Sequence, residues 1–409
     1  MQPNGHLAVQ PWMTDPRTQR VVGALARAGI TARFVGGCVR DALLGKPVGD
    51  VDLAIDRPPE PAMQVLEAAH LKVIPTGLKH GTITVVSGGK PFEVTTLRRD
   101  VETDGRRAVV EFTDDWRADA SRRDFTFNAM FCDAAGRLWD FFGGRDDLAA
   151  GRVRFVGDAA TRIDEDVLRI LRFFRFHAWY GRPPLDASGL AACSAAADKL
   201  RILSGERVRK ELLKLLQAAA PCDTIEVMAD IGLFRHWLPE YGGTGLLHRV
   251  VVNERSVSVP DGLRRLSAII GPEGDATTIG KRLRLSTQEA LRLTVLLAPE
   301  PVIDLEHGLP SVRRQVYRLG NALYVDRLMR RPEAADPGWM AAYRVATTWT
   351  PPELPVSGSD VLKRGLRAGR RVGALISALE GWWIDQDFRP DRATCLAELQ
   401  RRIDAGEGA

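Results

Sequence analysis

The residues best suited to chemistry lie in the stretch FVGGCVRDALLGKPVGDVDLAID, residues 34–56. The second half of this stretch has the pattern of a strand, whose alternation places Asp50 and Asp52 together on one face, opposite the apolar residues. Two carboxylates at that spacing repel each other, and solvent or a divalent cation is the usual way to keep both ionised. Oxygen ligands suit Mg2+, which typically completes its shell with water and substrate phosphates. The pair therefore indicates either a metal site or a solvated, aspartate-rich turn.

The first half of the stretch places a pair of glycines between an expected strand and an expected helix. Gly36 and Gly37 let backbone N–H groups approach a phosphate, and Arg40 follows within reach of the same group. No Gly-Lys-Ser/Thr sequence follows, which excludes a P-loop of the Walker type. Next to the carboxylate pair, this arrangement favours a site for a nucleoside triphosphate.

Composition and charge set the outer bounds. The chain has 409 residues, enough for several domains, and 57 Lys and Arg against 52 Asp and Glu give a net charge of +5, which permits an anionic partner without requiring one. No stretch approaches the ~18 apolar residues of a membrane span, and the N-terminus lacks the layout of a signal peptide, so we expect a cytoplasmic protein with no membrane contact. Five scattered cysteines without a CxxC pair predict reduced, mostly buried thiols.

The chain divides into two textures, a strand-rich part followed by a helical part. Strands are expected in RFVGG, VDLAI, GTITVVSGGKPFEVTTL, with SGGK as a hairpin turn, and RLWDFFGG. Helices are expected in EDVLRILRFFRFHAWY, SGERVRKELLKLLQAA, TIEVMADIGLFRHWL and QEALRLTVLLA. These patterns predict an α+β domain that leads into a long all-α region.

The order of strand, glycine turn, helix and Asp-x-Asp strand resembles the nucleotidyltransferase superfamily of DNA-polymerase-β type. GGCVRDALLG, DVDLAID, RRDFTFNAM at 122–130 and EDVLRILRFFRF at 165–176 follow in the order typical of bacterial tRNA nucleotidyltransferases, the CCA-adding enzymes, whose class also includes bacterial poly(A) polymerases. GERVRKELLKLL at 205–216 extends the resemblance. It implies a polymerase-β-type head with a mixed β-sheet over residues 1–150, then an all-α neck for base recognition (151–218), body (219–350) and tRNA-binding tail (351–409).

The resemblance implies roles for the first stretch. Asp50 and Asp52 would hold two Mg2+ ions, one activating the attacking hydroxyl of an RNA 3′ end and the other neutralising the triphosphate. Gly36, Gly37 and Arg40 would contact the phosphates of the nucleotide.

Sites of this superfamily usually add a third carboxylate from a neighbouring strand. Glu93 in KPFEVTTLR is our candidate, because its hairpin follows the Asp-x-Asp strand and alternation sends Glu93 opposite Phe92 and Val94. The alternative is an exposed strand glutamate.

The block RRDFTFNAM resembles the ribose-recognising motif of the family. Arg123 suits phosphate, and Asp124 and Asn128 can accept from and donate to sugar hydroxyls. Phe125 and Met130 are expected in the core.

The segment from Asp164 is expected to be one amphipathic helix with Glu165, Asp166 and Arg169 in its first turns. The sequence alone allows an ordinary capped helix with an (i, i+3) ion pair between Asp166 and Arg169. The resemblance instead implies a protein template, in which the Asp166 carboxylate accepts from the exocyclic amino group of cytosine or adenine and Arg169 donates to the ring nitrogen. Uracil and guanine present the opposite polarity. We assign Arg172 and Arg175 to triphosphate contact or to bracing Glu165.

Two further charged segments remain open. LRRDVETDGRRAVVEFTDDWRADA, from residue 97, is either a solvated loop or a mobile element that helps switch between CTP and ATP, with Asp100 and Arg106 as participants. The cations of KRGLRAGRRVG are predicted to bind tRNA phosphates rather than form a solvated face, and those chosen are Lys363, Arg364, Arg367 and Arg370. Neck cations are either solvated or follow the acceptor arm, among them Arg201, Arg207, Arg209, Lys210 and Lys214.

The resulting hypothesis is a CCA-adding enzyme that transfers CMP and AMP from CTP and ATP to the tRNA 3′ end, with no protein partner implied. A poly(A) polymerase is the alternative, but such enzymes tend towards strongly basic C-terminal extensions, whereas this chain ends in RRIDAGEGA. A catalytically silent RNA-binding protein is disfavoured, because both aspartates of the Asp-x-Asp pair are present.

Overall fold

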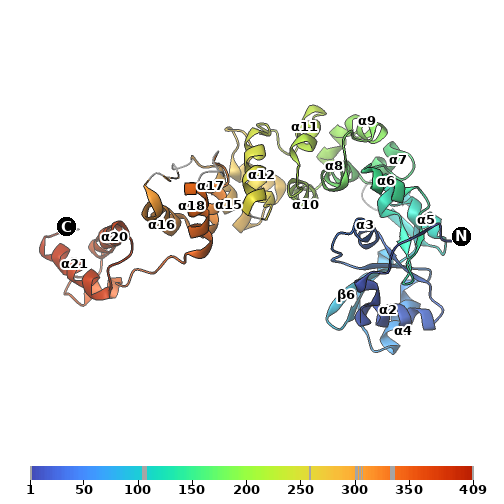
Figure 1. The fold of residues 1–409 in the computed structure, drawn as a ribbon, viewed down its shortest axis with the longest axis horizontal. Helices are drawn as coiled ribbons and strands as arrows, with labels where there is room; N and C mark the ends of the chain where they lie inside the picture. The colour runs from blue at the N-terminus through green and yellow to red at the C-terminus, as the bar shows by residue number, and fades with distance from the viewer. Residues whose placement is uncertain are drawn as a thin grey trace. The chain divides into compact units, whose positions relative to one another are not determined.

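A computed structural model describes residues 2–103, 108–257, 259–299, 303, 305, 307–331 and 337–407. The chain forms two compact units, one made of Met1–Tyr241 with Arg282–Arg284 and the other of Gly242–Lys281 with Leu285–Ala409. All ten named strands lie in the first unit, at the blue and cyan end of the chain in Figure 1. The predicted order of an α+β domain followed by helices is confirmed.

The strands are β1 (Gly5–His6), β2 (Ala32–Val35), β3 (Asp52–Ile55), β4 (Lys72–Gly77), β5 (Thr82–Ser87), β6 (Lys90–Thr96), β7 (Arg98–Thr103), β8 (Ala108–Phe112), β9 (Phe131–Cys132) and β10 (Arg137–Trp139). The helices up to residue 230 are α1 (Pro11–Thr14), α2 (Pro16–Arg27), α3 (Gly37–Leu43), α4 (Pro59–Ala68), α5 (Trp116–Ser121), α6 (Gly144–Ala150), α7 (Ala159–Glu165), α8 (Arg169–Tyr180), α9 (Ala187–Ala195), α10 (Gly205–Leu216) and α11 (Cys222–Asp230). The later helices are α12 (Gly245–Val257), α13 (Gly262–Ser267), α14 (Ala276–Leu283), α15 (Thr287–Leu297), α16 (Gly308–Leu319), α17 (Asn321–Leu328), α18 (Pro337–Thr348), α19 (Gly358–Leu362), α20 (Arg370–Asp385) and α21 (Arg392–Asp404).

The main sheet has eight strands in the order β1-β10-β9-β2-β3-β6-β5-β4. Strands β3 and β6 pair in parallel, while their other neighbours pair antiparallel, so the sheet is mixed as predicted. The predicted hairpin is also confirmed, since β5 and β6 pair from Thr82–Thr95 to Ser87–Lys90 around a turn at residues 88–89.

Strand β3 runs through the middle of the sheet and is buried on both faces. Leu53 and Ile55 are buried as alternation predicted, but Ala54 is buried too. Helices α2 and α4 pack on β5, and Ala54 belongs to a separate apolar cluster with Val35 and Phe131. The carboxylate-bearing start of β3 is therefore anchored by a strand that cannot shift without opening the core.

The charged segment after β6 has regular structure in its described residues, 97–103 and 108–120. Strands β7 and β8 pair into a separate two-stranded sheet, and α5 follows. The backbone of Asp100 pairs with Val110 in this hairpin. Arg106 lies outside the described residues, and a role of the hairpin in switching specificity stays a prediction.

The single helix expected from Asp164 is two helices, and that prediction was wrong. Helix α7 ends at Glu165, Asp166 has an extended backbone (φ −152°, ψ 105°), and α8 begins at Arg169. The Asp166 carboxylate accepts a hydrogen bond from the backbone N–H of Leu168 at 3.1 Å. Such a bond, two residues along the chain, offers the backbone an alternative to the helix and so separates α7 from α8.

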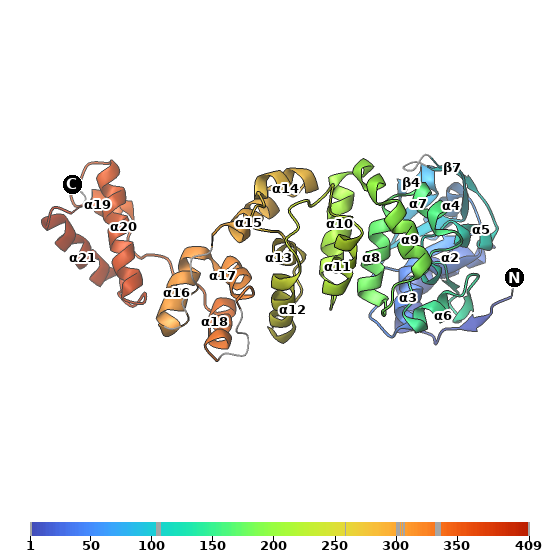
Figure 2. The ribbon, with the colours of Figure 1, turned by 90° about the horizontal axis from the view of Figure 1, so that it is seen from above.

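Helix α8 is fixed to the strand-bearing part by aromatic packing. Phe125 lies 4.9 Å from Phe155 and 5.3 Å from Phe176 between ring centroids, and Phe155 stacks on Phe173 at 5.6 Å. Phe125 is fully buried, as predicted, and so is Met130. Figure 2 shows α8, α10 and α11 side by side, and α8 contacts both partners.

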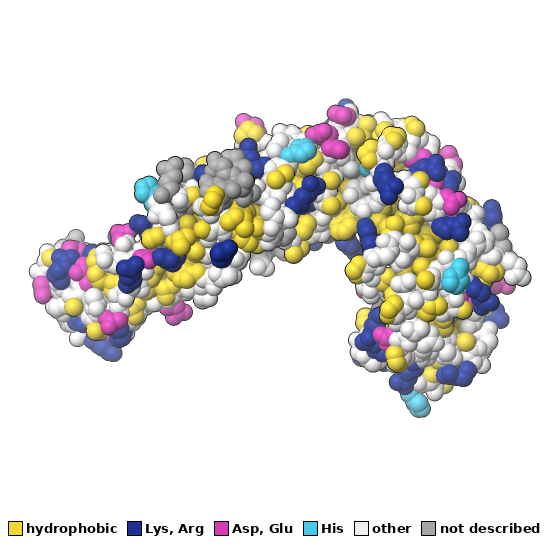
Figure 3. Space-filling model, in the orientation of Figure 1, with side chains coloured by type: hydrophobic (Ala, Val, Ile, Leu, Met, Phe, Trp, Pro, Cys, Tyr) yellow, Lys and Arg dark blue, Asp and Glu magenta, His cyan; other side chains and the backbone are white. Residues whose placement is uncertain are grey.

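Two apolar clusters can be traced among the described residues of the second unit. One is built from α16–α18 around Tyr324 and Trp339, and the other from α19–α21 around Leu379 and Trp383. In Figure 3 the C-terminal end carries Lys and Arg side chains interspersed with Asp and Glu on the face in view. All five cysteines are free and buried. Among the described helices, none is both long and apolar enough to cross a bilayer.

Candidate active site

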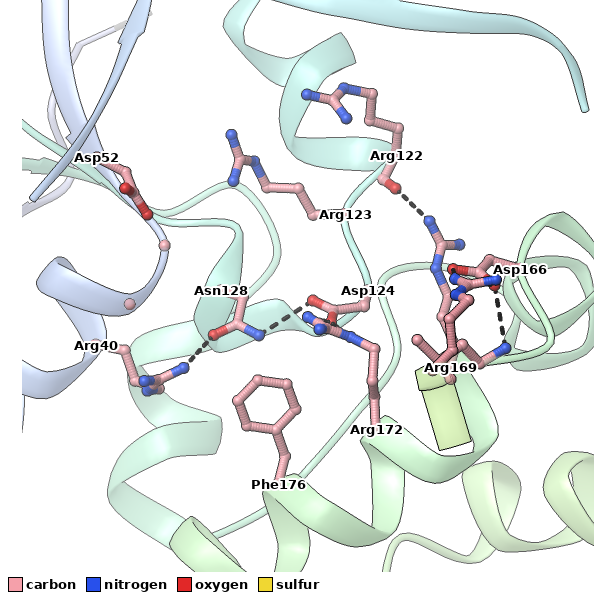
Figure 4. Close-up of a pocket in the computed structure, with 14 residues that line it drawn as sticks. Arg40, Asp52, Arg122, Arg123, Asp124, Asn128, Asp166, Arg169, Arg172 and Phe176 are labelled. Atoms are coloured by element: carbon pink, nitrogen blue, oxygen red, sulfur yellow. Dashed lines mark hydrogen bonds and ion pairs between the residues drawn. The ribbon is translucent and has the colours of Figure 1, made fainter. Parts of the chain in front are cut away.

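A cavity of about 450 Å³ opens between the sheet and α8 (Figure 4). Its lining residues come from α3, β3, the block around residue 124, the α7–α8 turn, α8 and α10. They are Gly36, Gly37, Arg40, Asp52, Arg122, Arg123, Asp124, Asn128, Asp166, Leu168, Arg169, Arg172, Phe176 and Arg207. The structure thus gathers most of the predicted head and neck residues around one space, whereas Asp50, Glu93, Glu165 and Arg175 do not line it.

Asp52 begins β3 and lies within electrostatic range of two other carboxylates. Its Cα pairs in register with that of Glu93 on β6, and Glu93 is exposed between buried Phe92 and Val94, as alternation predicted. Burial, then the charges of Glu93 and Asp50, raise the pKa of Asp52 to about 6, while Arg123 opposes the shift. Three carboxylates therefore share one electrostatic environment at this edge of the cavity.

The carboxylates fit an open magnesium site better than a closed metal cage. Within the described part of the chain, no group of three or more His, Cys, Asp or Glu side chains is gathered closely enough to hold a metal ion. Mg2+ commonly takes one or two carboxylates and completes its shell with water and substrate phosphates. Asp50 is exposed and Asp52 half-buried, and a cation would relieve the repulsion that raises the pKa of Asp52.

The glycine turn is set by the backbone. Gly36 has φ +73° and ψ −123° before α3, a conformation that favours glycine. Arg40, predicted as a phosphate contact, is buried, and its Nη1 donates to Asn128 Oδ1 at 2.8 Å while Nε donates to Asp41 at 2.9 Å. In this structure Arg40 therefore orients the Asn128 amide.

Asp124 is the centre of a chain of polar contacts across the cavity floor (Figure 4). Its Oδ1 accepts from Asn128 Nδ2 at 3.1 Å and from the Phe125 backbone, and its Oδ2 accepts from Arg172 Nε at 2.7 Å. Burial alone would raise the pKa of Asp124, but Arg172 and Asn128 outweigh it and the pKa lies at about 2. Arg172 thus pairs with Asp124 rather than bracing Glu165, and ribose contact by Asp124 and Asn128 stays a prediction.

The base-reading candidates have different partners from those expected. Asp166 pairs with Arg207 of α10 at 2.7 Å, and Arg169 pairs with Glu165 at 2.5 Å, so the ordinary (i, i+3) pair between Asp166 and Arg169 does not form. Arg169 also donates to the backbone carbonyls of Arg162 and Arg122 at 3.0 and 2.8 Å. Glu165 therefore braces Arg169 from outside the cavity.

Arg175 does not reach the cavity or Glu165. It pairs with Glu211 of α10, a buried carboxylate. Burial, the largest effect, lowers the pKa of Arg175, with Glu211 opposing. Both earlier assignments for Arg175 are replaced by a structural role between α8 and α10.

Among the lining residues, Arg122 and Phe176 were not predicted as nucleotide contacts. Phe176 follows Arg172 by one turn on the same face of α8, a spacing that could have identified it. Arg122 and the predicted Arg123 are both held by the buried carboxylate of Asp119, which precedes them by three and four residues. Arg207 was left as either a solvated neck cation or an acceptor-arm contact, and its pairing with Asp166 was missed because 41 residues of sequence separate the two.

The raised pKa of Asp52 predicts a stability cost at neutral pH. Above pH about 6 Asp52 is ionised in the folded protein, although its pKa there is higher than in the unfolded chain, and this difference destabilises the folded state. Asp52→Asn removes the charge, so it should stabilise the metal-free protein by roughly 1–2 kcal/mol near pH 7.5. The gain should shrink as pH falls through 6 and vanish below about 4, where both states are protonated. Urea unfolding at several pH values measures it.

The matched control is Asp146→Asn, which removes an exposed carboxylate of α6 with a side chain 79% exposed and should change stability little at any pH. Mg2+ should stabilise the wild type more than Asp52→Asn, because only the former keeps the full carboxylate set. A loss of stability in Asp52→Asn at pH 7.5 would contradict the strained-carboxylate account.

Comparison with known proteins agrees with this geometry. Residues 32–154 match the family model of the poly A polymerase head domain, and residues 185–242 match the model described as probable RNA and SrmB-binding site of polymerase A. The mitochondrial CCA tRNA nucleotidyltransferase 1 of Mus musculus is 35% identical over 375 residues, covering 90% of this chain and 86% of that protein. The CCA-adding enzyme of Levilactobacillus brevis is 32% identical over 382 residues, covering 88% and 91%.

A solved structure extends the similarity to the fold. The crystal structure of the Bacillus stearothermophilus CCA-adding enzyme in complex with CTP has a TM-score of 0.78 and 28% identity, and the match covers 96% of this chain and 99% of that one. Identity above 30% over nearly the whole length of two relatives, together with this fold, shows that the chain is homologous to them. The chain belongs to the family of CCA-adding tRNA nucleotidyltransferases.

Proposed function

We propose that this protein adds CMP and AMP from CTP and ATP to the 3′ end of tRNA, releasing pyrophosphate, without a nucleic acid template. The observation that carries the proposal is the placement of Asp166 and Arg169 on one side of the cavity and Asp52 on the other (Figure 4). A nucleotide seated between them would have its base at the α7–α8 turn and its triphosphate at β3. This function agrees with the sequence-based prediction of a cytoplasmic protein, which stays a prediction.

The hydrogen bonds that Arg169 makes leave it donors for reading a base. Three of its five N–H groups donate to Glu165 and to the carbonyls of Arg162 and Arg122. The Nε–H and one Nη2–H have no partner among the described residues, and either can donate to the unprotonated ring nitrogen of cytosine or adenine. Uracil and guanine carry an N–H at that position, which leaves the guanidinium unpaired at a cost of about 1–3 kcal/mol.

Asp166 would supply the acceptor for the exocyclic amino group. Its two oxygens already accept from Arg207 Nη2 at 2.9 and 2.7 Å, and this pairing keeps the carboxylate ionised and aimed at the cavity. A carboxylate has room for further donors beside one guanidinium nitrogen. Arg207 is therefore a positioning residue in this proposal.

The chemical step is assigned to the opposite end of the cavity. Asp50 and Asp52 would hold Mg2+, with Glu93 as the third carboxylate. The chemistry that such a metal would supply is activation of the attacking 3′ hydroxyl and neutralisation of the charge on the triphosphate. Arg123, held by Asp119 at 2.9 Å, and the backbone at Gly36 and Gly37 would contact phosphate.

Incubation with tRNA that ends at the discriminator base tests the function. CTP and ATP are supplied separately and together, and the products are sequenced. CCA addition predicts ends in CC with CTP alone and in CCA with both. Long adenosine tracts would indicate a poly(A) polymerase, and unchanged RNA would refute nucleotide transfer. Asp52→Ala should abolish transfer while leaving tRNA affinity within a few-fold, because distant cations hold the RNA.

Reversing the polarity of the reading pair should change base preference. Asp166→Arg combined with Arg169→Asp presents a donor to the carbonyl of uracil and an acceptor to its ring N–H, so the ratio of UTP to CTP incorporation should rise. Total activity should fall by ~100-fold or more, because the new charges meet Arg207 and Glu165 and a misplacement of about 1 Å has that effect. The incorporation ratio is the measurement.

Arg207→Gln is the matched control for the reversal. It removes the brace on Asp166 without changing the polarity of the reading edge, so activity should drop while CTP stays preferred over UTP. A folded double variant with the wild-type preference would show that Asp166 and Arg169 do not read the base.

The tail cations remain our proposed tRNA-binding residues. Lys363 and Arg367 are exposed between α19 and α20, and Arg370 is exposed at the start of α20, while Arg364 is half-buried and donates to the Asp360 carbonyl at 3.1 Å. Gly365 lies in the turn after α19 with φ +88°. This backbone conformation explains the choice of glycine there without a phosphate contact.

Replacing Lys363, Arg364, Arg367 and Arg370 with glutamine should weaken tRNA binding and its salt dependence. The slope of log Kd against log salt should fall by roughly 0.7–0.9 for each RNA phosphate that the variant no longer neutralises. Filter binding at several salt concentrations gives the slope.

The control for the tail variant removes the same number of exposed cations from the head, namely Arg27, Arg57, Lys72 and Lys79. It separates a local interaction with RNA from the effect of net charge. Equal slopes in the tail variant and the wild type would show that these four cations are solvated and do not contact RNA phosphates.

A further inference from the structure

Trp179 is an exposed aromatic side chain held in a fixed orientation. The residue is 41% exposed at the end of α8, and its Nε1 donates to the Lys214 carbonyl of α10 at 2.7 Å. Tryptophan is costly to leave in water, and its one polar group is already paired with protein. The indole is therefore presented at the surface with its apolar rings available.

Trp179 lies on the same interhelical seam as the cavity. Three contacts between α8 or its preceding turn and α10 define this seam: Asp166 with Arg207, Arg175 with Glu211, and Trp179 with Lys214. Residue numbers rise together along both sides, so α8 and α10 run parallel, and Trp179 lies one turn beyond Phe176, the last residue of α8 that lines the cavity. From Arg172 to Trp179 is two helical turns, about 10 Å.

Cations surround this end of the seam. Lys210 and Lys214 are exposed and one turn apart on α10, following Arg207 at helical spacing. Lys46 Nζ lies 3.4 Å from the Trp179 carbonyl oxygen and 4.4 Å from the Tyr180 ring centroid. Glu211, at the middle of the seam, is buried and paired with Arg175. Asp41, which accepts a hydrogen bond from Tyr180, is paired with Arg40, so the excess charge at this end of the seam is positive.

We propose that Trp179 stacks on a base near the 3′ end of the RNA substrate, with Lys46, Lys210 and Lys214 contacting the adjoining phosphates. An aromatic platform beside cations is the arrangement by which proteins hold single-stranded RNA independently of sequence. The two turns of α8 between Arg172 and Trp179 correspond to the length of roughly three stacked nucleotides, so the stacked base is one that lies outside the cavity. This inference rests on the proposed function.

Kinetics with two substitutions separate stacking from support of the helices. Trp179→Ala should raise KM for tRNA lacking CCA by about ten-fold and leave KM for CTP within two-fold. Trp179→Phe keeps a ring but loses the N–H donor, so it should retain most of the RNA affinity. If Trp179 only pinned α8 to α10, Phe and Ala would behave alike. Ile202→Ala, which removes a 58% exposed apolar side chain from the neck, is the control and should change neither KM.

Fluorescence of 2-aminopurine tests the stacking itself. The base is placed at successive positions near the 3′ end of the tRNA, and one position should be quenched by the wild type and by Trp179→Phe but not by Trp179→Ala. The inference is overturned if the wild type adds CMP yet no position depends on residue 179, or if Trp179→Ala changes only the oligomeric state. A wild type that adds no CMP refutes the proposed function, and this inference with it.

Discussion

The buried carboxylate of Asp124 is the constraint on which the rest of the site depends. It lies where the ribose-type block of the head meets α8, and burial there is tolerated only because Arg172, Asn128 and a backbone N–H replace water. Asn128 in turn accepts a hydrogen bond from Arg40 of α3, which extends the network to that helix. One carboxylate thereby fixes the glycine turn and α8 relative to each other, and with them the two ends of the cavity, which we propose to bind the phosphates and the base.

Charge around the cavity follows from this arrangement. Six arginines line it, against the three aspartates Asp52, Asp124 and Asp166. Asp124 and Asp166 are each neutralised by an arginine, whereas Asp52 is half-buried near other carboxylates and has a raised pKa. The cavity therefore has a positive excess that suits a triphosphate, and one strained carboxylate where a cation would be stabilised. A nucleotide bound with a metal ion satisfies both.

The sequence predicted features set by local periodicity and missed those set by distant partners. Alternation placed Glu93 opposite Phe92, and the spacing of glycines placed the β5–β6 turn, because both depend on neighbouring residues. The apolar pattern of EDVLRILRFF continues through Asp166, so it could not reveal that a side-chain bond to Leu168 divides the helix. Ion pairs such as Asp166 with Arg207 and Asp124 with Arg172 join residues far apart in the sequence, and only the tertiary fold brings them together. Local patterns could therefore not predict them.

Base selection by protein side chains alone is the central claim of this account. Equilibrium binding of CTP, ATP, UTP and GTP to the protein with Mg2+ and without RNA tests it most directly. An unpaired donor or acceptor at Asp166 or Arg169 should weaken UTP and GTP by about ten-fold or more relative to CTP and ATP. Four dissociation constants within two-fold of one another would contradict the claim that Asp166 and Arg169 select the base.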